Sequence, residues 1–211
     1  MDADSSRLVT ETIKQLHPTQ ITVGVIAVKA KIARWRQMPA GKRKACLASH
    51  WFPAVKGPDG AYYITDRHHT GLALQRSDVK KVQLVVLKDL SGLEPDAFWM
   101  AMDHHDWVHP YDAKGRREAF SRIPERLEDL VDDPYRSLAD HVQKLGGYAQ
   151  TGMPYAEFLW ADFFRNRLHI QTTRAGWENA TAAAVALARE ERARCLPGWC
   201  GAEGPSDGKH R

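Results

Sequence analysis

The chain has 211 residues, of which 43% are hydrophobic and 27% charged, so it has room for one domain of ordinary size with a real core and a helical appendage. Its formal net charge of +4 and isoelectric point near 9.0 are compatible with a nucleotide or nucleic-acid partner, and a basic solvated surface explains them equally well. No apolar run approaches the roughly 18 residues of a membrane helix, which excludes such a helix from this sequence and predicts no membrane partner.

The N-terminal residues and the cysteines indicate the cellular compartment. Residues 1–6 are acidic and polar and lack the basic start and apolar centre of a signal peptide, so we expect a cytoplasmic protein unless a leader has been removed. The three cysteines, Cys46, Cys195 and Cys200, are odd in number and widely spread, which favours neither a disulfide framework nor a zinc site.

The first half of the chain alternates between strand and helix patterns. Runs of β-branched and apolar residues indicate the strands, and turn or polar segments separate them. We expect strands at residues 19–28, 51–55, 62–65 and 79–87, and helices at residues 7–16, 38–50 and 70–76. This order predicts an α+β fold with a small mixed sheet.

The second half of the chain has helical patterns. We expect helices at residues 96–102, 127–131, 135–145, 155–165 and 176–194, and disorder from Pro197 onward, where glycine, proline and polar residues show no periodicity. The predicted domains are an N-terminal helix or arm (1–17), an α+β core (18–93), a helical extension packed on the core (94–195) and a disordered tail (196–211).

A polar corner joins a strand to a helix at residues 61–74. The strand pattern ends at Thr65, the helical pattern begins at Thr70, and the sequence Asp-Arg-His-His lies between them. Such a junction directs backbone N–H groups and the positive end of a helix dipole at one point, which attracts phosphate. We expect the amides of residues 67–69 to be open to a ligand there.

The corner and two later segments resemble one protein family. A strand followed by Asp-x-His-His and a helix is similar to the phosphate-binding box of the ParB/sulfiredoxin superfamily. Residues 132–139 (DDPYRSLA) and 157–163 (EFLWADF) resemble segments of its "ParB-like nuclease" branch of uncharacterised bacterial proteins. The resemblance covers about residues 18–170 and implies a ParB/sulfiredoxin-like core with a helical C-terminal extension.

The resemblance implies phosphoryl chemistry on a nucleotide. A superfamily member with this box is a free-serine kinase, and the partition proteins hydrolyse a nucleoside triphosphate. By that likeness the chain is a nucleotide-dependent kinase or NTPase that binds ATP, ADP or CTP with Mg²⁺, or another phosphorylated small molecule. His68 and His69 would contact phosphates, and Asp66 would orient an imidazole or hold the Mg²⁺ ion.

Further residues would complete this ligand site. Arg67 stands where the relatives have a small residue, and Thr70 stands where they have arginine. Either the Arg67 guanidinium serves the site from a position three residues earlier in the chain, or the site has no arginine. Lys29 and Lys31 follow the first predicted strand and would neutralise developing charge. His68 occupies the position of the sulfiredoxin cysteine, which argues against sulfiredoxin activity.

A second polar cluster begins at Asp103. This carboxylate could join Asp66 at a metal ion, and His104 and His105 could form a second wall of the same cleft. The alternative is that both histidines only cap the end of a predicted helix.

Three alternatives to nucleotide chemistry remain open. In the first, Asp66 merely caps a helix and one histidine is packed locally. In the second, the chain is a metal-dependent nuclease in which Asp103 and His104 join the corner around the ion. In the third, it binds DNA without catalysis, and the backbone phosphates are contacted by Arg34, Arg36, Lys42, Arg43 and Lys44.

Overall fold

The computed structural model describes residues 7–171 and 173–202, which form two compact units. The first unit ends at Asp132 and the second begins at Asp133. Residues 94–132, which the sequence assigned to the helical extension, therefore belong to the same unit as the sheet. No helix in the described ranges is long and apolar enough to cross a membrane.

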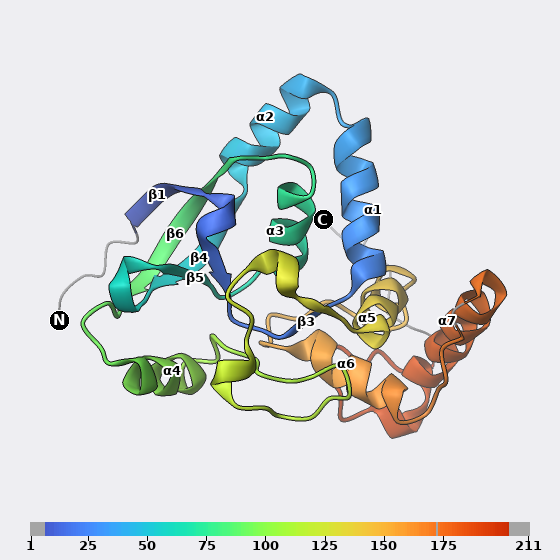
Figure 1. Cartoon of the computed structure of the whole chain (residues 1–211). Helices are drawn as coiled ribbons and strands as arrows, with labels where there is room; N and C mark the ends of the chain where they lie inside the picture. Colours follow the sequence, from blue (N-terminus) through green and yellow to red (C-terminus); the bar gives the residue numbers. More distant parts are fainter. Residues whose placement is uncertain (1–6, 172, 203–211) are drawn as a thin grey trace, which may run out of the picture. The chain divides into compact units, whose positions relative to one another are not determined.

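A five-stranded mixed sheet forms the centre of the first unit (Figure 1). The β1–β6 and β4–β5 pairs are antiparallel, whereas β6–β4 and β5–β2 are parallel. In spatial order the strands are β1 (Arg7–Thr12), β6 (Lys81–Asp89), β4 (Trp51–Lys56), β5 (Tyr62–Ile64) and β2 (Leu16–Pro18). With helices in both units, this confirms the predicted α+β class.

Two predicted elements near the N-terminus are wrong. Residues 7–16 form β1, a 3₁₀ turn (η1, Ile13–Gln15) and the start of β2 instead of a helix, because β1 pairs along its whole length with the apolar strand β6. Within residues 19–28 the structure has only a short strand, β3 (Thr22–Val23), and the range ends in the first four residues of helix α1 (Val25–Gln37). In both places tertiary pairing overrides local propensity.

Four helices accompany the sheet in the first unit. They are α1, α2 (Ala40–Ser49), α3 (His68–Gln75) and α4 (Pro95–His104). Figure 1 shows α3 between the sheet and α1. Gly71 on α3 permits close packing against strand β4 and Leu127, since a Cβ atom on it would lie 3.5 Å from the Phe52 ring and 3.1 Å from a Leu127 methyl group.

Short elements connect the main helices and strands of the first unit. They include three 3₁₀ turns, η2 (Pro58–Gly60), η3 (Phe120–Arg122) and η4 (Leu127–Asp129), and strand β7 (Val131–Asp132). The predicted helix at residues 127–131 is therefore η4 followed by β7. Because β7 pairs in parallel with β3, the end of this unit lies at the start of α1.

The second unit consists of helices, as its sequence predicts. They are α5 (Pro134–Lys144), α6 (Ala156–Arg165), α7 (Arg174–Arg189) and the 3₁₀ turn η5 (Glu191–Ala193). The aromatic face of α6 is core, and Trp160 stacks on Tyr148 with 4.2 Å between ring centroids.

The segment after η5 is more ordered than predicted. Leu196 and Trp199 pack against the core of the second unit, and the Trp160 Nε1–H group donates a hydrogen bond of 2.8 Å to the Pro197 carbonyl. The rest of the predicted disordered tail, residues 203–211, lies outside the described residues.

Candidate functional site

The polar corner follows β5 as predicted, but one of its amides is already bonded. Arg67 adopts the left-handed conformation (φ 66°, ψ 24°), a strained geometry for a residue with a side chain, and α3 begins at His68. The Arg67 N–H group donates to Oδ1 of Asp66 at 2.5 Å. The expectation of an open amide at Arg67 is therefore wrong, because the exposed Asp66 carboxylate occupies that position.

Both histidines of the corner accept hydrogen bonds from the backbone. His68 is 4% exposed, and its Nε2 atom accepts from the Thr19 amide at 3.0 Å. Nε2 of the half-buried His69 accepts from the Gly24 amide at 2.9 Å. An imidazole nitrogen that accepts is unprotonated, so both rings hold the segment between β2 and α1 in this tautomer.

The starts of α1 and α3 lie together at this site. His69, in the first turn of α3, reaches Gly24, which is the N-cap residue of α1. The next amide of α1, that of Val25, donates to Oδ1 of Asp132 at 2.8 Å. Two helix N-termini, each with a carboxylate on one of its amides, therefore form the centre of the candidate site.

Asp132 is the site residue that sequence reasoning missed. It lies within the DDPYRSLA segment, but no local pattern connects it to α1, which is 107 positions away. The connection depends on the pairing of β3 with β7, a long-range contact between two-residue strands.

The side chain of Arg67 is held beside the corner. Its guanidinium carbon lies 5.0 Å from the centroid of the Trp51 ring, a cation–π distance. Thr70, in the first turn of α3, is half-buried. Both predicted ligand residues therefore belong to the corner itself.

The predicted lysines are exposed on α1. Lys29 lines a cavity of about 400 Å³ between α1 and the end of α3, together with Ile32, Arg36 and Arg76. Lys29 therefore lies beyond the first turn of α1, near Arg36 of the same helix and Arg76 at the end of α3. Lys31 lies on the same helix.

The second polar cluster lies on another part of the first unit. Side chains of β5 alternate between two cores: Ile64 packs in the one that contains α3, and Tyr63 in the one that contains α4. Helices α3 and α4 therefore cover opposite faces of the sheet. His104 ends α4 and His105 is its C-cap, so the structure does not bring them to the corner as a second wall.

Asp103 and the histidines near it have other partners. Asp103 forms an ion pair of 2.8 Å with Arg117, and the His105 ring stacks on Trp107 at 4.4 Å. In the described part of the chain, no group of three or more histidines, cysteines and carboxylates is arranged to hold a metal ion. Asp66 and Asp103 are therefore not members of such a group.

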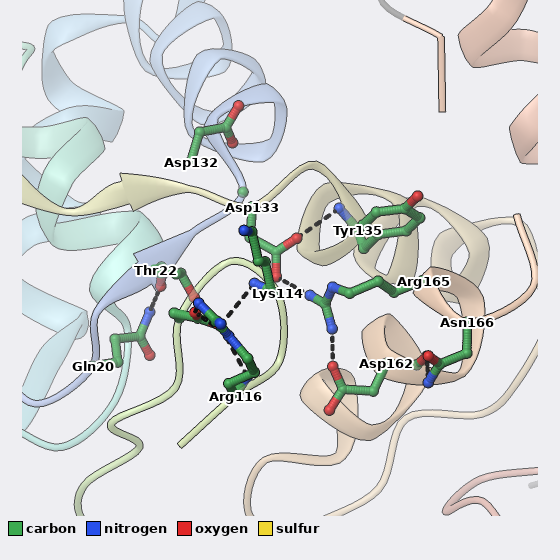
Figure 2. Close-up of polar contacts among 12 residues, drawn as sticks. Gln20, Thr22, Lys114, Arg116, Asp132, Asp133, Tyr135, Asp162, Arg165 and Asn166 are labelled. Atoms are coloured by element: carbon green, nitrogen blue, oxygen red, sulfur yellow. Dashed lines mark hydrogen bonds and ion pairs between the residues drawn. The ribbon is translucent and has the colours of Figure 1, made fainter. Parts of the chain in front are cut away.

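A tight loop follows the second cluster. Asp112 accepts hydrogen bonds of 2.9 Å from the amides of Lys114 and Arg116 and pairs with the Arg116 guanidinium at 2.6 Å (Figure 2). Burial alone would raise the pKa of Asp112, but the bonds from Arg116 and Lys114 outweigh it and lower the pKa to about 2. Arg116 and Arg117 are thus both engaged with carboxylates.

We expect the Asp112→Ala variant to lose about 1 kcal/mol in free energy of unfolding at pH 7, because these bonds lie near the surface. The unfolded pKa of 3.8 exceeds the folded value, so this contribution is present above pH 3.8 and is lost as the pH falls toward 2. Urea titrations at pH 7, 4 and 3 should show the parent and the variant converging. A constant difference would contradict the assignment.

Comparisons with known proteins agree with this architecture. The crystal structure of protein Atu1540 from Agrobacterium tumefaciens superposes with a TM-score of 0.87 at 40% sequence identity, covering 94% of this chain and 98% of that chain. No curated protein matches the chain. The family model described as "Putative ParB-like nuclease" matches residues 9–166, about three quarters of the sequence. The chain therefore belongs to the ParB-like nuclease family.

Proposed function

We propose that this ParB-like protein binds a phosphorylated small molecule, a nucleotide, where α1 and α3 begin. The observation that supports the proposal is the pair of carboxylates on the two helix starts: Asp66 on the Arg67 amide and Asp132 on the Val25 amide. Helix N-termini stabilise anions, and here two of them are joined through His69 and Gly24. Phosphate oxygens are ligands of the same kind as these carboxylates.

Binding would exchange internal acceptors for phosphate oxygens. The Arg67 amide would pass from Asp66 to the ligand, and the Gly24 amide would pass from His69 to the ligand. Asp66 is exposed and therefore free to rotate away from the amide. The Arg67 guanidinium, held by Trp51, would supply a positive charge beside the phosphates.

The released carboxylate suits Mg²⁺. This ion is typically held by one or two protein carboxylates together with substrate phosphates and water, so it does not require three protein ligands. Asp66, with Asp132 as the second carboxylate, would hold it. Mg²⁺ would neutralise charge on the phosphates during transfer to an acceptor or to water.

The corner residues take different roles in this proposal. Asp66 and His69 face the ligand and carry the phosphoryl chemistry. His68, buried and bonded to the Thr19 amide, is a positioning residue that fixes the start of α3.

Thermal-shift measurements with ATP, ADP and CTP in the presence of Mg²⁺ test the proposal. A ligand at 100 times its Kd adds about 2.7 kcal/mol of stability, which raises Tm by several degrees. We expect the double variant Arg67→Ala, His69→Ala to lose this shift. Lys42→Ala, an exposed change on α2, should retain it.

The variant Asp66→Ala gives a sharper test. Removing the carboxylate that occupies the Arg67 amide should strengthen nucleotide binding without Mg²⁺ and abolish the additional effect of Mg²⁺. If none of the three nucleotides shifts Tm, or if Asp66→Ala weakens binding in the absence of metal, the exchange of acceptors is wrong.

A second candidate function, binding of DNA, is supported by the charge of the N-terminal region. Residues 12–58 contain no aspartate or glutamate but nine lysines and arginines. On α1 and α2 these side chains are mostly exposed, and α2 has no buried residue at all. The basic residues of the two helices are Lys29, Lys31, Arg34, Arg36, Lys42, Arg43 and Lys44.

Salt dependence separates the two candidates. Duplex binding through phosphates should weaken steeply with salt, and the double variant Lys42→Ala, Lys44→Ala should lower the slope of log K against log salt by about 1.8. The corner variants should leave this slope unchanged. Plasmid cleavage that requires Mg²⁺ or Mn²⁺ and stops on chelation would instead identify a nuclease.

A further inference from the structure

An aromatic slot lies on the face of the sheet that carries α4. Its volume is about 340 Å³, and its main lining residues are His17, Pro58, Tyr63, Pro95, Phe98 and Trp99. Tyr63 and Phe98 belong to the core on this face, whereas α3 packs in the core on the other face. The aromatic slot is therefore separate from the site at the helix starts.

The rings of the slot are fixed by their neighbours. Tyr63 lies 4.7 Å from Phe98 and 5.5 Å from Trp99 between ring centroids, and Trp99 stacks on Phe120 at 5.7 Å with an interplanar angle of 11°. Gly57 leaves room for Tyr63, since a Cβ atom there would lie 2.5 Å from the ring. Rings that are already ordered lose little entropy when a flat ligand stacks on them.

His17 supplies a hydrogen-bonding group in the slot. It is paired with Tyr63 in the register of β2 and β5, and the two ring centroids are 4.9 Å apart. Burial lowers the pKa of His17, and the opposing effect of Glu125 is smaller. The imidazole is therefore neutral near pH 7, with one donor and one acceptor for the edge of an uncharged heterocycle.

A second cavity, of about 450 Å³, adjoins the slot and shares His17 and Ala61 with it. Glu11, Lys14 and Gln15 are among its lining residues. One acid and one base give this cavity a balanced charge, which suits a hydroxylated neutral group such as ribose. A chain of phosphates would meet a single lysine and a repelling carboxylate.

We propose that the aromatic slot and its neighbouring cavity bind a purine nucleoside. The base stacks on Trp99 and meets the Tyr63 ring edge to face, because these two rings stand at 85° to each other. Its polar edge lies at His17, and the ribose extends toward Lys14 and Gln15. A cavity of this size accommodates a bicyclic base. Free nucleosides and unpaired bases of nucleic acids share this chemistry, and the site is independent of the nucleotide site proposed above.

Isothermal titration of the full chain with adenosine tests this inference. We expect saturable binding with a Kd on the order of 100 μM, the value for a ligand of this size with ordinary efficiency. ATP should bind this site no more tightly than adenosine does. A short oligoadenylate that binds more tightly than adenosine, and is weakened by the same slot variants, would identify nucleic acid as the source of the base.

Two slot variants and one control complete the design. Trp99→Leu removes a stacking surface, and His17→Phe keeps a ring of similar size without its polar atoms; each should weaken adenosine binding about tenfold or more. The corner variant Arg67→Ala, His69→Ala should bind adenosine like the parent. The inference is overturned if neither adenosine nor oligoadenylate binds at millimolar concentration. It is equally overturned if both slot variants, with parental melting curves, bind as tightly as the parent.

Discussion

Replacing Asp133 by alanine should lower the free energy of unfolding by about 3–5 kcal/mol, because it removes one partner of a buried ion pair. Asp133 is 1% exposed and pairs with the Arg165 guanidinium in the second unit (Figure 2). Its other carboxylate oxygen caps α5 by accepting from the Tyr135 amide at 3.0 Å. The substitution would therefore remove a countercharge and a helix cap together.

A second buried arginine increases the expected loss. Arg136 is 7% exposed, and its guanidinium carbon lies 3.7 Å from the centroid of the Phe158 ring. Its Nε and Nη1 atoms have no hydrogen-bond partner among the residues that the structure describes. Burial lowers the pKa of Arg136, while the nearby charges of Glu157 and Asp133 stabilise its protonated form. Without Asp133, the buried Arg136 and the partly buried Arg165 would both lose a neighbouring negative charge.

Asp162 provides a matched control for Asp133. It pairs with the same Arg165, but its side chain is 40% exposed. Asp162→Ala should therefore cost less than about 1 kcal/mol. Urea unfolding followed by tryptophan fluorescence measures both values, and equal losses for the two variants would contradict the importance of burial. The double variant Asp133→Leu, Arg165→Met should recover part of the stability, since it removes the Arg165 cation together with its countercharge. The recovery is incomplete because the Tyr135 amide and Arg136 still lose their contacts with Asp133.

Local patterns predicted the elements whose stability is mostly local. Helices α5, α6 and α7 follow from the helical patterns of their sequences. Strand β6 and the junction of β5 with α3 were likewise predicted, since each has a continuous apolar or turn pattern.

Long-range pairing explains the elements that the sequence did not reveal. Residues of β1 have an acceptable helical pattern, and only their pairing with β6 makes them a strand. The β-branched residues at the start of α1 favour a strand, but its amides are held by His69 and Asp132 in a helix start. The candidate site depends on the same contacts, so the sequence indicated the corner but not its second helix.

Replacing His68 by leucine should cost about 1–3 kcal/mol, because it leaves a buried amide without its acceptor. The Thr19 amide that donates to His68 belongs to a residue that is only 1% exposed, so water does not readily replace the imidazole. The Thr19 hydroxyl already has a partner, since it donates a hydrogen bond of 2.9 Å to the Ile64 carbonyl. Leucine fills a similar space but accepts no hydrogen bond.

His69→Leu is the control, because the His69 ring is only half-buried and its hydrogen bond with Gly24 is partly buried, whereas the bond between His68 and Thr19 is fully buried. We expect its cost to be under about 1 kcal/mol in the same urea titration. A His68→Leu chain as stable as the parent would show that the ring is not needed as an acceptor.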